Sequence, residues 1–154
     1  MLIKSEHEIE LMRESGHRLA RVLRAVASEV RAGITTQSLD NIARDCIKAE
    51  GGVPAFLGYK PNGASKPYPA VSCLSINSTV VHGIPGPYVI ADGDIVKIDL
   101  GLVYKGWYSD SAITVAVGEI GERTKKMIAA TEEALRAGVS AARPGNTLGD
   151  IGHA

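Results

Sequence analysis

The sequence predicts one domain of the α+β class, in which helices cover an antiparallel sheet. Two early segments, 5–33 and 36–52, carry apolar residues at helical spacing, and a third such segment follows at 122–142. Between them lie runs rich in β-branched residues, of which 94–104 and 111–117 are close enough to form a hairpin. The 154 residues, 45% hydrophobic and 22% charged, are sufficient for one domain with a substantial core.

Composition narrows the classes of partner. Lys plus Arg and Asp plus Glu each number 17, so the zero formal charge does not favour nucleic acid or an anionic membrane as the main partner. The N-terminus becomes charged too early for a signal peptide, and no run of about 18 apolar residues could span a bilayer. Cys46 and Cys73 form neither a disulfide framework nor a zinc-finger spacing. We therefore expect a cytoplasmic protein.

The first two helices have recognisable ends. Ser5 and Glu8 form a capping box that opens the first helix, and Gly33 ends it. The apolar positions of this helix are Ile9, Met12, Leu19, Leu23, Val26 and Val30. The second helix starts near Thr36 and stops at Gly51-Gly52. Its apolar face consists of Leu39, Ile42, Ala43, Cys46 and Ile47.

The middle of the chain predicts a loop, two short strands and the hairpin. Pro54–Pro69 is rich in glycine and proline, which favours a loop. Short strands are expected at Ala70–Ile76 and Thr79–Val81. Lys105-Gly106 then supplies a two-residue turn between the hairpin strands.

This hairpin brings two acids together. If Tyr104 pairs with Trp107 across the turn, Asp99 faces Ala112, and Asp110 shares the face of Asp99. The two carboxylates are then diagonal neighbours, roughly 7–8 Å apart at the backbone. Two acids so close repel each other unless a cation lies between them, which predicts a divalent metal site. The alternative is a pair of solvated surface acids.

The chain ends with a pattern met earlier. The third helix, Glu122–Ala142, is followed by Arg143-Pro-Gly-Asn-Thr147 and a short capped helix, 148–154. The same Arg-x-Gly-x-Thr pattern occurs 112 residues earlier, at Arg31–Thr35, also between a long helix and the next one. One interpretation is a fold of two similar halves. The other is that Gly-x-Thr is a common way to leave one helix and cap the next.

The segment Asn77-Ser-Thr-Val-Val-His82-Gly-Ile-Pro, followed by Asp99 and then Asp110 eleven residues on, resembles the N-terminal half of a type I methionine aminopeptidase. The resemblance covers essentially the whole chain. It implies the pita-bread fold, in which two αβ halves related by pseudo-twofold symmetry hold a dinuclear metal site. It also implies that residues 1–154 are the N-terminal part of a single M24-type peptidase domain, ending where the second half starts.

The resemblance assigns roles to the site residues. Asp99 matches a ligand that chelates one of two divalent ions (cobalt, manganese, iron or zinc), and Asp110 matches a ligand that bridges both. His82 matches a catalytic histidine that hydrogen-bonds the substrate. Asn77 and Thr79 resemble a loop that holds a monovalent cation through backbone oxygens.

The resemblance also implies an apolar pocket for a methionine side chain. Tyr59, Tyr68 and Cys73 match pocket positions of the family, and Phe56 falls where a smaller residue can occur. The alternative for these residues is ordinary packing in the core or in a loop.

The implied activity is removal of the initiator methionine from newly made polypeptides. Nascent N-termini would be the substrate and the ribosome a candidate partner, with no membrane and no sequence-specific nucleic acid involved. Three further ligands of the family, a histidine and two glutamates, lie in the second half, so we expect residues 1–154 alone to be inactive. The full-length protein is expected to be a monomer and a fragment could form a homodimer.

Two other functions remain open. A half-fold of this kind could act as a self-associating or polypeptide-binding module without catalysis. A proline-specific peptidase of the same superfamily shares the aspartate spacing, although such proteins usually carry an extra N-terminal domain.

Overall fold

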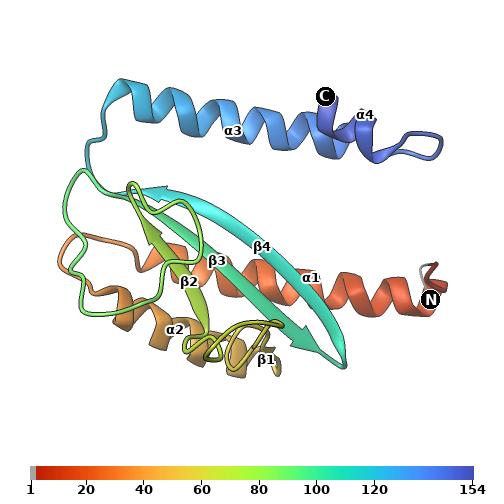
Figure 1. Cartoon of the computed structure of the whole chain (residues 1–154), viewed down its shortest axis with the longest axis horizontal. Coiled ribbons are helices and arrows are strands. Elements are labelled where there is room, and N and C mark those ends of the chain that lie inside the picture. The colour runs from red at the N-terminus through yellow and green to blue at the C-terminus, as the bar shows by residue number, and fades with distance from the viewer. Residues whose placement is uncertain (1–2) are drawn as a thin grey trace. The chain divides into compact units, whose positions relative to one another are not determined.

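A computed structural model describes residues 3–154, which contain four helices and four strands (Figure 1). The chain divides into two compact units, one up to Glu119 and the other from Ile120. The first unit holds two helices and the whole sheet, and therefore carries the predicted site.

Helix α1 (Glu6–Ser28) starts at the predicted capping box. The Ser5 hydroxyl accepts a hydrogen bond from the Glu8 N–H at 3.3 Å, and the Glu8 carboxylate accepts one from the Ser5 N–H at 2.7 Å. The helix ends earlier than the predicted Gly33, because Glu29 and Val30 close tighter bonds to carbonyls three residues back. Ile9 and Met12 remain exposed, whereas Leu19, Leu23 and Val26 enter the core.

Helix α2 (Thr36–Ala49) agrees closely with its predicted bounds. Thr35 caps it by accepting a hydrogen bond from the Ser38 N–H at 3.1 Å. Leu39, Ala43 and Ile47 are fully buried, and the remaining two predicted apolar positions are partly buried against the core.

Strand β3 (Ile95–Tyr104) is the centre of an antiparallel sheet. Strand β4 (Trp107–Ala116) pairs along one side of it, and β2 (Ser72–Ile76) and β1 (Val53–Pro54) pair along the other. The predicted hairpin register is confirmed, since Tyr104 lies opposite Trp107.

The predicted strand Thr79–Val81 is wrong. Asn77 has a left-handed backbone (φ 48°), and the Thr79 N–H returns to the Ile76 carbonyl at 2.9 Å, so the chain turns where the strand was expected. Val80 and Val81 are exposed, which shows that their β-branched side chains have no sheet face to cover.

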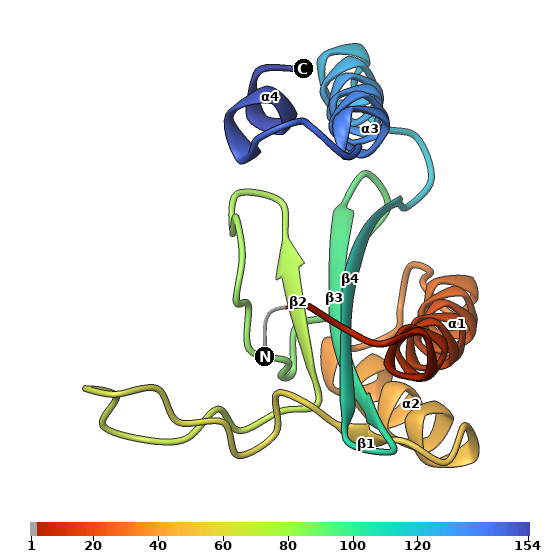
Figure 2. The same ribbon diagram turned by 90° about the vertical axis from the view of Figure 1, so that its right-hand side faces the viewer.

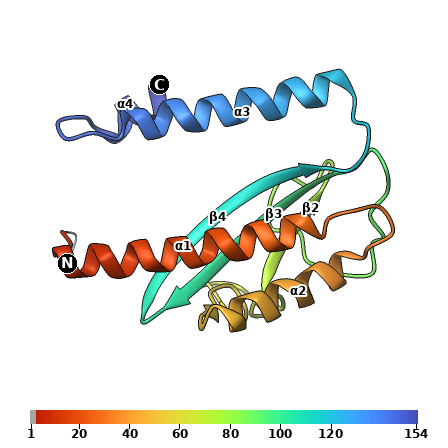
Figure 3. The same cartoon turned by 180° about the vertical axis from the view of Figure 1, so that it is seen from behind.

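Helices α1 and α2 lie on the same face of the sheet (Figures 2 and 3). Even-numbered residues of β3 point into the core between this face and the helices. The core residues of β3 are Val96, Ile98, Leu100 and Leu102. The odd-numbered residues, Asp99 among them, therefore face the other way. The loop after β1, residues 55–71, extends on that opposite side (Figure 2).

The second unit consists of α3 (Glu122–Ala141) and α4 (Leu148–His153), both close to prediction. Thr147 caps α4 just as Thr35 caps α2. Gly33 and Gly145, two residues before these caps, both have left-handed backbones, with φ of 88° and 94°. The two copies of Arg-x-Gly-x-Thr thus have the same local structure. Within residues 3–154, no helix combines the length and apolar character that a membrane crossing requires.

Candidate metal centre

Asp99 and Asp110 form the centre of the candidate site. Asp99 lies opposite Ala112 and Asp110 opposite Gly101, so both side chains are on the face turned away from the helices. Asp99 is half-buried and Asp110 is exposed. Burial raises the pKa of Asp99, and the adjacent Asp110 carboxyl, which hydrogen-bonds it, raises that pKa further. The pair is therefore a strained anionic site that a bound cation would relieve.

The chemistry of this pair fits a divalent ion, but the number of ligands is small. Carboxylate oxygens are hard donors that zinc, manganese and related ions accept. Among residues 3–154, however, no group of three or more His, Cys, Asp or Glu side chains is arranged to hold a metal. Asp99 and Asp110 therefore suit part of a ligand set and not a complete one.

Cys73 and Tyr68 lie beside Asp99. Cys73 is opposite Asp99 across the β2–β3 pairing and is buried, and burial raises the pKa of its thiol. The Tyr68 hydroxyl lies 3.0 Å from the Ser72 carbonyl and 3.2 Å from the Gly83 carbonyl. Burial, and next its hydrogen bond with Cys73, raise the pKa of Tyr68, which therefore stays protonated. These two predicted pocket residues are brought together at β2.

His82 is held by the residue that follows it. Its backbone is left-handed (φ 57°), so the chain bends sharply at this residue, and the strand predicted before it is absent. The Gly83 carbonyl accepts a hydrogen bond from the Leu74 N–H at 2.8 Å, and the Gly83 N–H donates to the Ser75 hydroxyl at 3.0 Å. The backbone directly after the histidine is thus hydrogen-bonded to β2. Burial raises the pKa of Asp99, and the electrostatic interaction with His82 opposes that rise.

Asn77, although exposed, is the centre of a separate hydrogen-bond network. Its N–H donates to the Ile95 carbonyl at 3.1 Å, its side-chain oxygen accepts from the Ile95 N–H at 3.0 Å, and its side-chain nitrogen donates to Asp94 at 2.7 Å. Its carbonyl accepts a hydrogen bond from the Lys97 ammonium at 2.6 Å. Thr79, the other residue of the predicted cation loop, is exposed.

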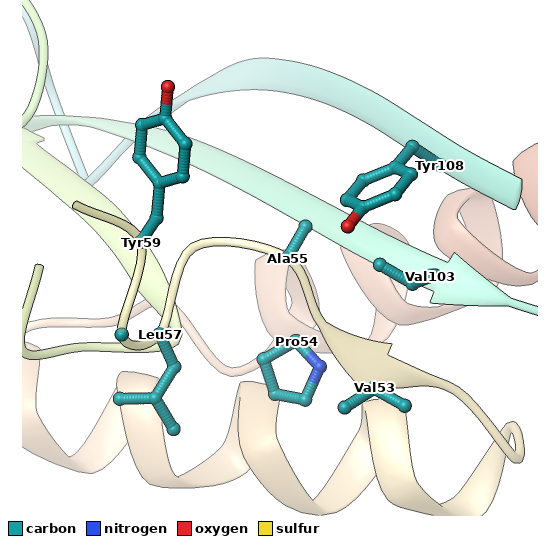
Figure 4. A pocket seen from close by; sticks show the side chains of 8 residues that line it. Val53, Pro54, Ala55, Leu57, Tyr59, Val103 and Tyr108 are labelled. Carbon is teal, nitrogen blue, oxygen red and sulfur yellow. The ribbon is translucent and has the colours of Figure 1, made fainter. Parts of the chain in front are cut away.

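The other two predicted pocket residues lie elsewhere on the same side of the sheet. Tyr59 is on the wall of an open groove of about 450 Å³ (Figure 4). The groove is lined by Val53, Pro54, Ala55, Leu57, Gly58, Tyr59, Val103 and Tyr108. Phe56 packs over Gly101, where an added Cβ would come within 2.7 Å of its ring. The predicted pocket set is therefore divided: Cys73 and Tyr68 lie at β2, Tyr59 lines this groove, and Phe56 lies over Gly101 of β3.

Two residues that the sequence analysis did not single out belong to this region. Tyr108 lines the groove opposite Val103, and the alternation that placed Asp110 also puts Tyr108 on its face. Asp40, only 1% exposed, accepts hydrogen bonds from the backbone of Val71 and Ser72 at 3.0 and 2.8 Å. A carboxylate within the apolar stripe of α2 was the signal that could have identified it.

The sheet therefore carries helices on one face and two adjacent carboxylates on the other, which is the donor chemistry of a partial divalent-metal site. The family model described as Metallopeptidase family M24 matches residues 10–154. The chain therefore belongs to metallopeptidase family M24.

Several relatives are methionine aminopeptidases. The chain is 45% identical over 148 residues to the methionine aminopeptidase of Aquifex aeolicus, covering 96% of this chain and 57% of that protein. It is 40% identical over 154 residues to methionine aminopeptidase 1 of Bacillus subtilis, covering 100% of this chain and 60% of the relative. The crystal structure of methionine aminopeptidase from Rickettsia prowazekii superposes with a TM-score of 0.92 at 35% identity, over 98% of this chain and 58% of that one.

The resemblance inferred from the sequence motifs is confirmed, and so is the α+β, pita-bread fold that it implied. The chain spans only about three-fifths of the length of these relatives.

Proposed function

We propose that the protein containing this chain removes the initiator methionine from newly made polypeptides, by hydrolysis assisted by two divalent metal ions. The observation that carries the proposal is the adjacent, like-charged pair Asp99 and Asp110 in a chain 40–45% identical to methionine aminopeptidases. The substrate would be the N-terminus of a nascent polypeptide, and the ribosome is a candidate partner.

Asp99 and Asp110 would hold the metal ions as chelating and bridging ligands. Cobalt, manganese, iron and zinc all accept carboxylate ligands, so the choice among them depends on availability as well as on geometry. Such ions, when bound, supply an activated water and polarise a carbonyl. Because the rest of the ligand set lies outside residues 1–154 in this proposal, the chain alone would have little or no activity.

The remaining residues would bind and orient the substrate. His82, fastened through Gly83 to β2, would hydrogen-bond the substrate near the scissile bond. Aromatic rings and a thiol suit a methionine thioether, which favours Tyr59, Phe56 and Cys73 as contacts for the side chain. Tyr68 would contribute its ring, because its hydroxyl is engaged by backbone carbonyls.

The proposed full-length enzyme is a cytoplasmic monomer. The sequence predicts a monovalent cation at Asn77 and Thr79, where the Lys97 ammonium already donates a hydrogen bond to the Asn77 carbonyl.

A second candidate is a self-associating module that binds polypeptides without catalysis. Two observations favour it: β4 pairs only with β3 among the described residues, and α3 leaves apolar side chains exposed. The exposed apolar residues of α3 are Met127, Leu135 and Val139. An open strand edge of this kind can pair with a second chain.

The decisive experiment starts with the protein isolated from its native cells. Its intact mass is measured, and release of methionine from a Met-Gly peptide is assayed with each of the four metals, beside an Xaa-Pro peptide. We expect methionine release, no cleavage of the Xaa-Pro bond, and a loss of about 100-fold or more in kcat/KM for Asp110→Asn. Asp45→Asn, an exposed acid on α2, is the matched control and should retain activity.

Other results would contradict the proposal. A native protein that binds divalent metal but releases no methionine would favour the binding module. Cleavage of only the Xaa-Pro peptide would favour the proline-specific peptidase. Full activity from residues 1–154 alone would contradict the proposal that further metal ligands outside these residues are required.

A further inference from the structure

Lys97 is the one basic residue on the carboxylate face of the β3–β4 hairpin. It lies opposite Ser75 on β2 and Thr114 on β4, two positions along β3 from Asp99. Its ammonium donates a hydrogen bond to the carbonyl oxygen of Asn77 at 2.6 Å. A positive charge is thus already present at this carbonyl.

The orientation of the Asn77 carbonyl is fixed by the rest of that residue. The N–H and both side-chain polar atoms of Asn77 are bonded to Ile95 and Asp94. The left-handed backbone (φ 48°) turns the chain sharply after β2. The carbonyl is therefore the remaining polar group of Asn77, and it is directed at Lys97.

A free monovalent cation does not fit beside this contact. A sodium or potassium ion at the Asn77 carbonyl would have to share one oxygen with an ammonium group, and two like charges at that separation repel. The ammonium is a compact point charge with three donors, so it can satisfy a carbonyl that would otherwise bind a metal cation. The residues present thus disagree with the monovalent site that the family resemblance implies.

We infer that the ammonium of Lys97 occupies the cation position at the Asn77 carbonyl, so that this protein carries its own cation and needs neither sodium nor potassium there. Because the lysine is covalently attached to the neighbouring strand, its local concentration is far above that of any free salt. Its role is to position the turn at Asn77 and the segment that leads to His82. The inference goes beyond the proposed activity and does not depend on it.

Thermal unfolding of residues 1–154 tests this directly, with a chelator present and at equal ionic strength in potassium, sodium or choline chloride. Choline is too large to bind at a carbonyl site, so the unfolding temperature in choline chloride is that of the protein without a bound monovalent cation. Wild type should unfold at the same temperature, within about 1 °C, in all three salts. Lys97→Ala should unfold about 3–6 °C lower in choline and regain part of that loss in potassium or sodium.

Two further variants complete the experiment. Lys97→Gln keeps most of the side-chain length without the charge and should show the same salt-specific recovery, which covers the case in which Lys97→Ala does not fold. Lys66→Ala, at an exposed lysine of the 55–71 loop, should be indifferent to the choice of salt.

Stabilisation of wild type by potassium or sodium over choline would overturn the inference, because a free cation would then bind despite Lys97. So would Lys97 variants whose loss neither potassium nor sodium reverses. None of these measurements uses peptidase activity, so the two proposals can fail separately.

Discussion

The Asp40 carboxylate on α2 accepts two hydrogen bonds from Ser72, one from its N–H at 2.8 Å and one from its hydroxyl at 2.7 Å. The same oxygen accepts the Val71 N–H at 3.0 Å. Ser72 is the first residue of β2, and Cys73 follows it on the opposite face. A helix on one side of the sheet thereby determines where the strand beside Asp99 begins.

Replacing Asp40 should therefore destabilise the whole first unit. Asp40→Ala leaves three buried donors without their charged acceptor, which should lower the free energy of unfolding by about 3–5 kcal/mol. Urea denaturation of residues 1–154 measures this. Arg44→Ala is the control, because Arg44 is largely exposed and lies 3.9 Å from Asp40, so its loss should cost about 1 kcal/mol or less. Equal effects of the two variants would contradict the role given to the buried carboxylate.

Gly83 should tolerate no side chain. A Cβ there would lie 2.3 Å from the Leu74 carbonyl oxygen, so the backbone after His82 would have to leave β2. We expect Gly83→Ala to cost about 2 kcal/mol or more and to change the NMR signals of the His82 ring. Gly86→Ala is the matched control, since an added Cβ there meets nothing within 4 Å. Unchanged His82 signals in Gly83→Ala would show that the contact does not position the histidine.

Removing the charge of Asp99 should stabilise the metal-free chain. Burial, and then Asp110, raise the pKa of Asp99 above its ordinary 3.8, so the folded state holds the proton more tightly than the unfolded state does. Stability is therefore lost as pH rises from about 3.8 through the raised pKa, and Asp99→Asn should escape this loss. Melting temperatures with a chelator at acidic and neutral pH measure the effect, with Asp45→Asn as control. A lower melting temperature for Asp99→Asn at neutral pH would contradict it.

Divalent metal should have the opposite effect and make wild type more stable than Asp99→Asn. Manganese or zinc should raise the melting temperature of wild type, because an ion between Asp99 and Asp110 binds only the folded state. Asp110→Asn should respond much less. A similar increase in both proteins would place the metal elsewhere.

Asp94 should make the fold sensitive to acid. Burial alone would raise its pKa, but hydrogen bonds from the Ala91 N–H, the Asn77 amide and the Tyr88 hydroxyl hold that pKa below 3.8. Its contribution is therefore present at neutral pH and lost as pH falls below about 3.8 through the lowered pKa. Asp94→Asn should cost about 2–3 kcal/mol at neutral pH, and Tyr88→Phe, which removes one of the three bonds, should cost less. Denaturant unfolding at pH 7 and at acidic pH checks both, and a loss that persists unchanged in acid would contradict this account.

The features that the sequence predicted correctly are mostly local. Ser5, Thr35 and Thr147 cap helices through hydrogen bonds to residues three positions along the chain. The hairpin register follows from one two-residue turn and from the two-residue alternation of side chains along a strand. The errors have non-local causes. The strand expected at Thr79–Val81 is prevented by the network that joins Asn77 to β3, and β1 is too short to have a pattern of its own.

The candidate site, too, was predictable only where its residues are close together in the sequence. Asp99 and Asp110 could be placed together because they belong to one hairpin. The partners of Tyr68 and Gly83 could not, because a long loop and two separate segments meet at β2. The individual roles of the site residues stay predictions.

The proximity of Asp99 and Asp110 in one hairpin also has a consequence for the order of folding. The two acids are eleven residues apart in one hairpin, and hairpins form in about 1–10 µs, before contacts between distant segments. The bond from Asp40 to Ser72, by contrast, must close a loop of about thirty residues. When the complete chain refolds, we therefore expect the acidic pair to assemble first, so that the two carboxylates lie together while the helices are still unpacked.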